Sequence, residues 1–280
     1  MSYIQEIPEI EKYWDNFSDE YSSQDDATNV FYLSLLNMLK VNTRKQILEV
    51  GAGAGFLYNH TMNYKRPEAS YVATDLSEKM LSILCKRLQI QEGFRDQLFV
   101  EKYNLKVEKA NGEQLQYSDN TFDCYIANLC LQITTNPEKM IAEAFRVLQK
   151  GGVAGFTVWG DKAKSYYFNI VPEVLAKYGI QPPASRPMFH LNDREKLIKM
   201  LEDAGFTNVI CWNQFSPFHH QTEDEFNRLL NYPRNLEAFA MAGDKSQEVK
   251  QECLKRMMDH IQLNKLPLGL DGLIIIATKN

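Results

Sequence analysis

Short apolar runs alternate with amphipathic stretches between residues 46 and 159 of the chain. Apolar runs bounded by glycine and polar residues predict buried strands, and apolar residues three and four positions apart predict helices. Strands are expected at residues 47–50, 70–75, 105–110, 122–127 and 153–159, and helices at 56–64, 77–90 and 137 to about 151. Strands that alternate with helices in this way are typical of a parallel sheet covered by helices.

Capping residues support these boundaries and extend the pattern toward the C-terminus. Ser77 and Asn136 precede the second and third helices, each with a side-chain oxygen suited to a free backbone N–H. Asn192 predicts the start of a further helix, which ends at Gly205. Two more strands follow at residues 207–215 and 273–278, which gives seven strands in all.

Three segments fall outside this alternation, at residues 1–40, 160–191 and 216–265. The first has a helical pattern, whereas Pro182, Pro183 and Pro187 predict an irregular cover in the second. In the third, Thr222 and Glu225 form a capping box that opens two or three helices. Connections this long are usually lids or binding elements. We expect one domain over 1–280, with a helical cap at 1–40, a cofactor-binding core at 41–159 and cover segments at 160–191 and 216–265.

The composition of the chain predicts its cellular compartment and excludes two classes of partner. The chain has 280 residues, 44% of them hydrophobic and 24% charged, with a net charge of −5. An acidic balance provides no general attraction to a phosphate backbone, so we expect no nucleic-acid partner. The chain has five scattered cysteines, its N-terminal stretch lacks the pattern of a secretory signal, and no apolar run is long enough to span a bilayer. These features predict a cytoplasmic protein without membrane contact.

The most informative motif is the decapeptide ILEVGAGAGF at residues 47–56. An apolar strand ends there in Gly51, Gly53 and Gly55, where minimal side chains allow a tight turn and a close approach to a ligand. The next strand ends at Asp75, and an acid at that place in doubly wound folds accepts hydrogen bonds from a ribose. Small residues in such a turn can also serve packing alone, but the acid favours an adenosine-type cofactor.

The third glycine and a nearby acid distinguish between adenosine cofactors. Dinucleotide folds place glycine at the sixth position, which is Phe56 in this chain. Glu49 lies two residues before the first glycine, where it suits a cationic ligand and would repel a pyrophosphate. The pattern of Glu49, Gly51, Gly53 and Gly55 resembles motif I of class I S-adenosylmethionine (SAM)-dependent methyltransferases.

The resemblance continues beyond motif I. The run from Lys109 to Leu115, followed by Ser118 to Asp123, resembles the Asp-Ala-Glu and Asp-x-Ser-Phe-Asp segments of the type-11 methyltransferases, among them the ubiquinone/menaquinone C-methyltransferases. The segment IAEAFRVLQKGG is similar to their helix before strand five, and residues 272–279 are similar to their final antiparallel strand. The family implies an α/β, doubly wound, mostly parallel seven-stranded sheet whose last strand is antiparallel, a Rossmann-like fold.

The resemblance also assigns cofactor contacts. It implies that Gly51 and Gly53 face the methionine part of SAM, Asp75 the ribose, and Asn128 the ammonium group through its carbonyl. It places Leu76 on one face of the adenine, and Asn111 and Gly112 at the adenine edge. The remaining expected contacts are Tyr13, Tyr21, Glu49, Ala52, Gly55, Met80, Glu113 and Leu129.

Two residues depart from the family pattern. Asn111 stands where the family has an aspartate that accepts from the adenine amino group, and an asparagine oxygen can accept the same bond. Gln116 replaces a loop proline.

The segment from Tyr13 to Tyr21 resembles the N-terminal helix that these enzymes fold over the cofactor. Tyr13 and Tyr21 could bond the methionine carboxylate or the methyl acceptor, and Trp14 and Phe17 would exclude water. The alternative for the two apolar rings is that they only dock the helix.

The sequence contains weaker evidence for the residues that bind the methyl acceptor and catalyse the transfer. Candidate catalytic residues are Tyr21, His190, His219 and His220, although a lone histidine is more often a surface or packing residue. Gln132, Trp159, Phe218 and Tyr232 are expected to line the acceptor pocket, or, for the last two, to form a small satellite core. No spacing of histidine, cysteine or carboxylates suggests a metal.

The function expected from the sequence is methyl transfer from SAM, without a metal, to a small-molecule acceptor, with S-adenosylhomocysteine (SAH) as product. Residues 128–131 lack the Asn/Asp-Pro-Pro-aromatic signature of enzymes that methylate a flipped base. Two alternatives stay open: a SAM-binding fold that serves as a catalytically silent assembly subunit, and a nicotinamide-type oxidoreductase. The oligomeric state is left undetermined.

Overall fold

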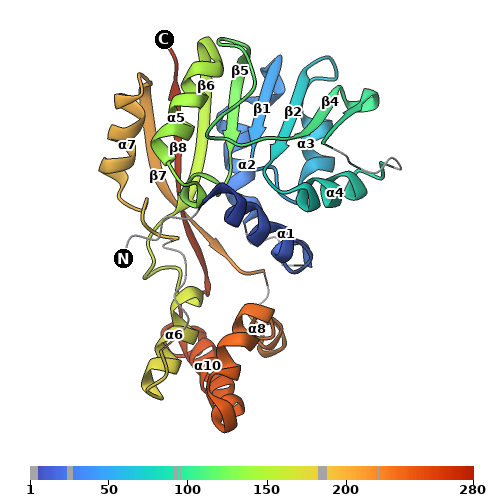
Figure 1. The fold of residues 1–280 in the computed structure, drawn as a ribbon. Coiled ribbons are helices and arrows are strands. Elements are labelled where there is room, and N and C mark those ends of the chain that lie inside the picture. The colour runs from blue at the N-terminus through green and yellow to red at the C-terminus, as the bar shows by residue number, and fades with distance from the viewer. Residues whose placement is uncertain (1–5, 24–27, 91–93, 95, 182–187, 220) are drawn as a thin grey trace.

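One sheet organises the molecule, which is a computed structural model describing residues 6–23, 28–90, 94, 96–181, 188–219 and 221–280. Within these residues eight strands follow the spatial order β3-β4-β2-β1-β5-β6-β8-β7 (Figure 1). The strands are β1 (Gln46–Val50), β2 (Ser70–Asp75), β3 (Gln97–Val100), β4 (Leu105–Lys109), β5 (Phe122–Ala127), β6 (Leu148–Trp159), β7 (Thr207–Pro217) and β8 (Gly269–Thr278).

The strand directions confirm the predicted fold class. β1 pairs in parallel with β2 and β5, β2 with β4, and β5 with β6. β8 lies between β6 and β7 and is antiparallel to both. The strand that the sequence did not indicate is β3, which forms an antiparallel edge on β4. It has only four residues, and its side chains are at most half-buried, so the sequence contains no apolar run that would predict it.

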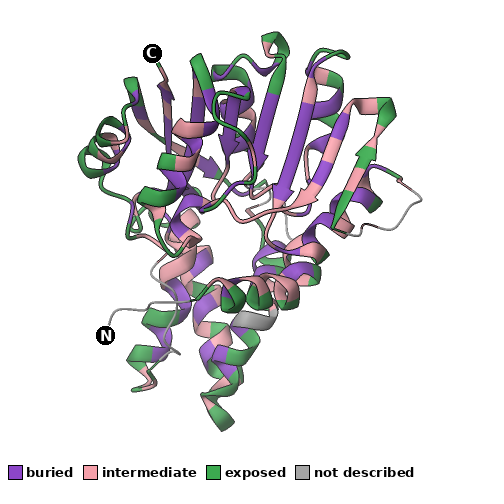
Figure 2. Ribbon diagram, turned by 45° about the horizontal axis from the view of Figure 1, so that its top comes forward, coloured by how far each residue is buried: buried purple, intermediate pink, exposed green. Residues whose placement is uncertain are grey.

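Helices cover both faces of the sheet because its central strands alternate apolar side chains between two cores. Ile47 packs with α2 (Asn29–Met38), α3 (Tyr58–Tyr64) and α4 (Glu78–Arg87) on one face. Leu48 packs with α5 (Pro137–Val147) and α7 (Arg194–Asp203) on the other. Figure 2 shows the resulting buried band through the centre of the sheet.

The cover elements lie at the carboxyl ends of the parallel strands (Figure 1). The helix α1 (Ile7–Ser23) runs across this edge, and α10 (Ser246–Gln262) packs against α6 (Tyr167–Lys177), α8 (Glu223–Leu230) and α9 (Pro233–Ala240) below it. Four short 3₁₀ helices complete the described elements: η1 (Val41–Thr43), η2 (Glu101–Tyr103), η3 (Leu131–Ile133) and η4 (Gly243–Lys245).

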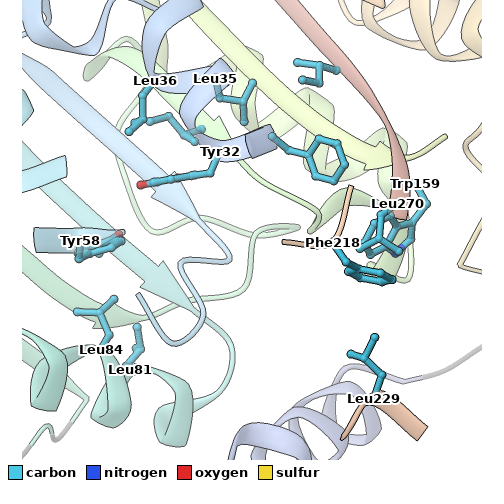
Figure 3. Close-up of a cluster of buried hydrophobic side chains, with 14 of the residues drawn as sticks. Tyr32, Leu35, Leu36, Tyr58, Leu81, Leu84, Trp159, Phe218, Leu229 and Leu270 are labelled. Carbon is cyan, nitrogen blue, oxygen red and sulfur yellow. The ribbon is translucent and has the colours of Figure 1, made fainter. Parts of the chain in front are cut away.

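This bundle of α6, α8, α9 and α10 shares a hydrophobic core with the sheet. Phe218 and Leu229 belong to the same buried cluster as Trp159 and Leu270, and Figure 3 shows Trp159, Phe218 and Leu270 gathered at the junction. Thr222 caps α8 by accepting a bond from the Glu225 N–H, as the capping box predicts.

Three expectations about the helices were wrong in detail. Residues 167–177 form α6 rather than an irregular cover, because burial of Ile170, Val174 and Leu175 outweighs the lost bond at Pro172; residues 182–187, with the other prolines, lie outside the described part of the chain. The helix α5 ends at Val147, since the next residue already pairs with β5. Asp193, rather than Asn192, caps α7.

Candidate functional site

The turn after β1 is built from left-handed glycines. Gly51, Gly53 and Gly55 have φ values of +76°, +56° and +66°, a region that other L-residues rarely adopt. A Cβ on Gly51 would lie 2.6 Å from the Cys130 sulfur, whereas a Cβ on Gly53 would meet only the Tyr21 ring at 3.9 Å. Gly53 therefore leaves its backbone open to a ligand.

Asp75 fixes the shape of this turn from the end of β2. Its Oδ2 accepts from the Gly53 N–H at 2.8 Å, and its Oδ1 accepts from the Ser77 N–H at 2.9 Å. Ser77 in turn caps α4 and donates its hydroxyl to Asp15 of α1. Burial raises the pKa of Asp75 to about 6 despite these backbone hydrogen bonds. The carboxylate is thus oriented, and its remaining lone pairs can serve a ribose.

Glu49 is a buried carboxylate that three tyrosines hold. Its Oε2 accepts from Tyr58 at 2.5 Å, Tyr71 at 2.5 Å and Tyr32 at 2.9 Å. The three hydroxyls come from α3, β2 and α2, and Figure 3 shows Tyr32 and Tyr58 extending toward each other. Burial raises the pKa of Glu49, although the three hydrogen bonds oppose this rise.

Two cavities meet at the glycine turn. The first, of about 730 Å³, lies between the carboxyl ends of the strands and α1, and the second, of about 430 Å³, lies between the turn and the start of α2. Tyr21, Gly51, Gly53 and Asn128 line both, so the two cavities form adjoining parts of one site.

The predicted cofactor residues converge on these cavities, with the single exception of Tyr13. The first is lined by Asp75, Leu76, Met80, Asn111, Gly112, Glu113 and Leu129, the second by Glu49, Ala52 and Gly55, and both by Tyr21, Gly51, Gly53 and Asn128. Tyr13 is 43% exposed, and its ring packs against Trp14 and Phe17 outside the cavities.

The residues at the expected adenine edge already have protein partners. The Asn111 side-chain oxygen accepts from the Glu113 N–H at 2.9 Å, and its second lone pair can serve a ligand. Glu113 accepts from the N–H and the hydroxyl of Thr135, which anchors the loop before α5. Gly112 packs so tightly that a Cβ would lie 2.7 Å from Val50.

The turn after β5 is held by Thr157 of β6. Its hydroxyl donates to Asn128 Oδ1 at 2.7 Å and accepts from the Leu129 N–H at 2.7 Å. Leu129 has φ +50°, an uncommon conformation for leucine, and Gln132 donates to its carbonyl. The backbone that faces both cavities is therefore braced from two sides.

The helix α1 closes the first cavity with Ile7, Ile10, Trp14 and Tyr21. Burial, and then the negative charge of Asp75, raise the pKa of Tyr21 to about 12, so its hydroxyl is a hydrogen-bond donor at neutral pH.

Polar contacts fasten α1 to the core. Lys109 bridges Glu11 and Glu78, and Arg87 donates to the Ser22 carbonyl while stacking on Phe56.

The expected acceptor-side residues line neither cavity, although Gln132 contacts Leu129 at the edge of the first. Gln132, Trp159 and Phe218 are buried, and Tyr232 is half-buried in the bundle. His190 and His219 are exposed and line neither cavity, so the described structure does not place them beside the cofactor residues. His220 lies outside the described residues.

The charge of the site is acidic. Glu49, Asp75 and Glu113 line the cavities, and no lysine, arginine or histidine is among the described residues that line them. Uncompensated carboxylates at low dielectric attract a cation and repel an anion. A ligand with a sulfonium and an ammonium group fits this lining, whereas a pyrophosphate does not.

Sequence reasoning missed several residues of the site. Tyr32, Tyr58 and Tyr71 read as ordinary apolar positions of a helix or strand, and nothing in their spacing connects them to Glu49. Cys130 belongs to none of the motifs found in the sequence, yet it lines the first cavity beside Gly51. Their position follows from how α2 and α3 pack on the sheet, which the local pattern does not contain.

Comparison with known proteins identifies related chains. A family model described as a methyltransferase domain, of type 11, matches residues 48–156. An uncharacterized protein of Methanocaldococcus jannaschii is 31% identical over 199 residues, which cover 70% of this chain and 82% of that protein. The ubiquinone/menaquinone biosynthesis C-methyltransferase UbiE of Cronobacter sakazakii is 29% identical over 185 residues, 62% of this chain and 70% of the relative.

Among solved structures, the crystal structure of the [4+2]-cyclase SpnF has a TM-score of 0.56 at 16% identity and covers 98% of this chain and 97% of its own. At this identity the likeness concerns the fold alone.

The pKa of Asp75 predicts a pH dependence of SAM binding. Ribose hydroxyls bond the charged carboxylate better, so SAM affinity should fall as the pH drops through about 6 and Asp75 takes up a proton. The folding stability of the free protein depends on pH in the opposite direction. Because the pKa of Asp75 is higher in the folded protein than its ordinary value, Asp75 stabilises the fold when the pH is below that ordinary value, and this contribution is lost as the pH rises through about 6. Calorimetric titration with SAM between pH 5 and 8 measures the first effect, and a flat affinity would contradict it.

Proposed function

Because the chain belongs to the type-11 class I SAM-dependent methyltransferases, we propose that it transfers the methyl group of SAM to a small-molecule acceptor. The observation that carries the proposal is the pair of adjoining cavities whose lining contains three carboxylates and no cation among the described residues. Such a lining suits a cationic methyl donor and disfavours the pyrophosphate of a nicotinamide dinucleotide.

When bound, SAM would supply an activated methyl group: the acceptor atom bonds to the methyl carbon as the carbon–sulfur bond breaks in line, and SAH leaves. Gly51, Gly53 and Asn128 would hold the methionine part, with Glu49 on its ammonium side. Asp75 would accept from the ribose, and Leu76 with Asn111 would contact the adenine. The protein's contribution to the rate is alignment and exclusion of water by α1, since the leaving group needs no protonation.

Calorimetry with SAM and with NAD tests the cofactor assignment. Binding of SAM with no heat from NAD is expected, and the reverse result would refute the proposal. Turnover should then be sought with labelled SAM and a panel of phenols, thiols, amines and carbon acids. We expect label in at least one acceptor, unchanged by a metal chelator; a chain that binds SAM but is silent across a broad panel would instead be an assembly subunit.

Removal of the Asp75 carboxylate, which is expected to accept hydrogen bonds from the ribose, gives a second test. Asp75→Ala should weaken SAM binding by about 1–3 kcal/mol, because ribose hydroxyls lose their partner. Asp123→Ala is the matched control: Asp123 also accepts two backbone N–H bonds, from Lys45 and Gln46, but lines neither cavity. Equal SAM affinity in wild type and Asp75→Ala would remove Asp75 from the site.

For the acceptor we propose a pocket near Gln132 and Trp159, at the carboxyl ends of β5 and β6. Gln132 Oε1 and Trp159 Nε1 are buried without a hydrogen-bond partner among the described residues, and such atoms are rare unless a ligand or water serves them. The rings of Phe168 and Phe189 lie 5.2 and 6.4 Å from the Trp159 ring. They would give the pocket apolar walls suited to an uncharged acceptor.

A substitution at Trp159 should separate acceptor from cofactor binding. Trp159→Phe is expected to lower kcat/KM for the acceptor by about tenfold and leave the SAM Kd unchanged. Gln132→Leu should lower kcat/KM and also weaken SAM binding, because it removes the hydrogen bond to the Leu129 carbonyl beside the first cavity. Trp212→Phe is the control, because Trp212 lies on β7 outside both cavities. In Trp159→Phe, a loss of SAM affinity equal to the loss of kcat/KM would contradict this placement.

For localisation, we propose a reducing compartment such as the cytoplasm. All five cysteines are free thiols, as expected for a reducing environment. No helix in the described part of the chain has the length and apolarity needed to cross a membrane.

A further inference from the structure

The contact between Glu49 and its three tyrosines has an unusual asymmetry. The hydroxyls of Tyr32, Tyr58 and Tyr71, here called the tyrosine cage, all donate to the same oxygen, Oε2. Among the described residues none donates to Oε1, and Glu49 lines the second cavity beside Gly51 and Gly53. One oxygen is thus saturated by the protein, and the other is left for a ligand.

The cage is buried and stays protonated. Tyr58 and Tyr71 are at most 1% exposed, and Tyr32 is 6% exposed. Burial and the Glu49 charge raise the pKa of each hydroxyl well above its ordinary value, so all three remain donors. Because they come from α2, α3 and β2, they hold the carboxylate relative to three separate elements.

Neutral donors leave the charge of the carboxylate uncompensated. Three hydrogen bonds reduce the cost of burying Glu49 and fix its rotamer, but no lysine, arginine or histidine among the described lining residues neutralises it. A cationic group that reaches Oε1 from the second cavity would supply that missing charge.

We propose that Tyr32, Tyr58 and Tyr71 are positioning residues that orient Glu49 so that Oε1 binds the ammonium end of the cofactor. The inference rests on the proposed function and deepens it, because it assigns the amino-acid tail of SAM or SAH to the second cavity. The tyrosines act through Glu49 and do not need to touch the reacting atoms.

Two ligands that differ only at this tail provide the test. SAH and 5′-methylthioadenosine share the adenosine and the thioether, but only SAH carries the ammonium and carboxylate. In Tyr58→Phe and in Tyr71→Phe, calorimetry should show SAH binding weakened by about tenfold and 5′-methylthioadenosine binding unchanged. The double variant should lose more, and Glu49→Gln should show the same selective loss.

Tyr125→Phe is the matched control. Tyr125 is fully buried on β5, and its hydroxyl has no hydrogen-bond partner among the described residues, so the substitution removes a buried hydroxyl without touching Glu49. It should bind both ligands as the wild type does.

The outcomes separate a positioning role from a structural one. If the tyrosines only stabilised the site in general, the substitutions would weaken the binding of both ligands by the same factor. That result, or unchanged SAH binding, would overturn the inference and leave the methyltransferase proposal standing. A wild-type chain that binds neither SAM nor SAH would instead refute the proposed function. If the double variant does not fold, Tyr32→Phe and the two other single variants still decide the question.

Discussion

The site depends on a turn that only glycine can make and on the carboxylate that holds it. Three left-handed residues within five positions would cost several kcal/mol if they carried side chains, and side chains on Gly51 and Gly55 would also collide with Cys130 and Leu84. Asp75 binds the middle glycine from the neighbouring strand. Because β1 and β2 are parallel neighbours, their carboxyl ends meet at one edge, and the turn and its clamp lie there together.

The same edge concentrates negative charge in a place from which water is partly excluded. The fold offsets the cost with neutral donors: backbone N–H groups for Asp75, tyrosine hydroxyls for Glu49, and Thr135 for Glu113. Neutral donors stabilise each carboxylate and leave its charge available to a ligand. A lysine or arginine in the same positions would have used up that charge within the protein.

The two cover regions play unequal parts. The helix α1 closes the cofactor side and is tied to α4 through Ser77 and Arg87. The bundle of α6, α8, α9 and α10 continues the hydrophobic core beyond the ends of β6 and β8, where Trp159 and Phe218 lie. Under the proposed function, the first region would cover the methyl donor and the second would lie on the acceptor side.

The sequence by itself determined the layers of the fold and predicted a group of residues that the structure brings to two adjoining cavities. Short apolar runs define β1, β2 and β5, and the glycine spacing with Glu49 and Asp75 predicts the cofactor, because each signal is local along the chain. The edge strand β3, the helix α6 with its internal Pro172, and the outward position of Tyr13 were decided by packing between distant segments. So was the tyrosine cage, in which residues 32, 58 and 71 converge on one oxygen of Glu49. A hydroxyl's partner depends on which helices cover the sheet and at what angle, and that information exists only once the chain has folded.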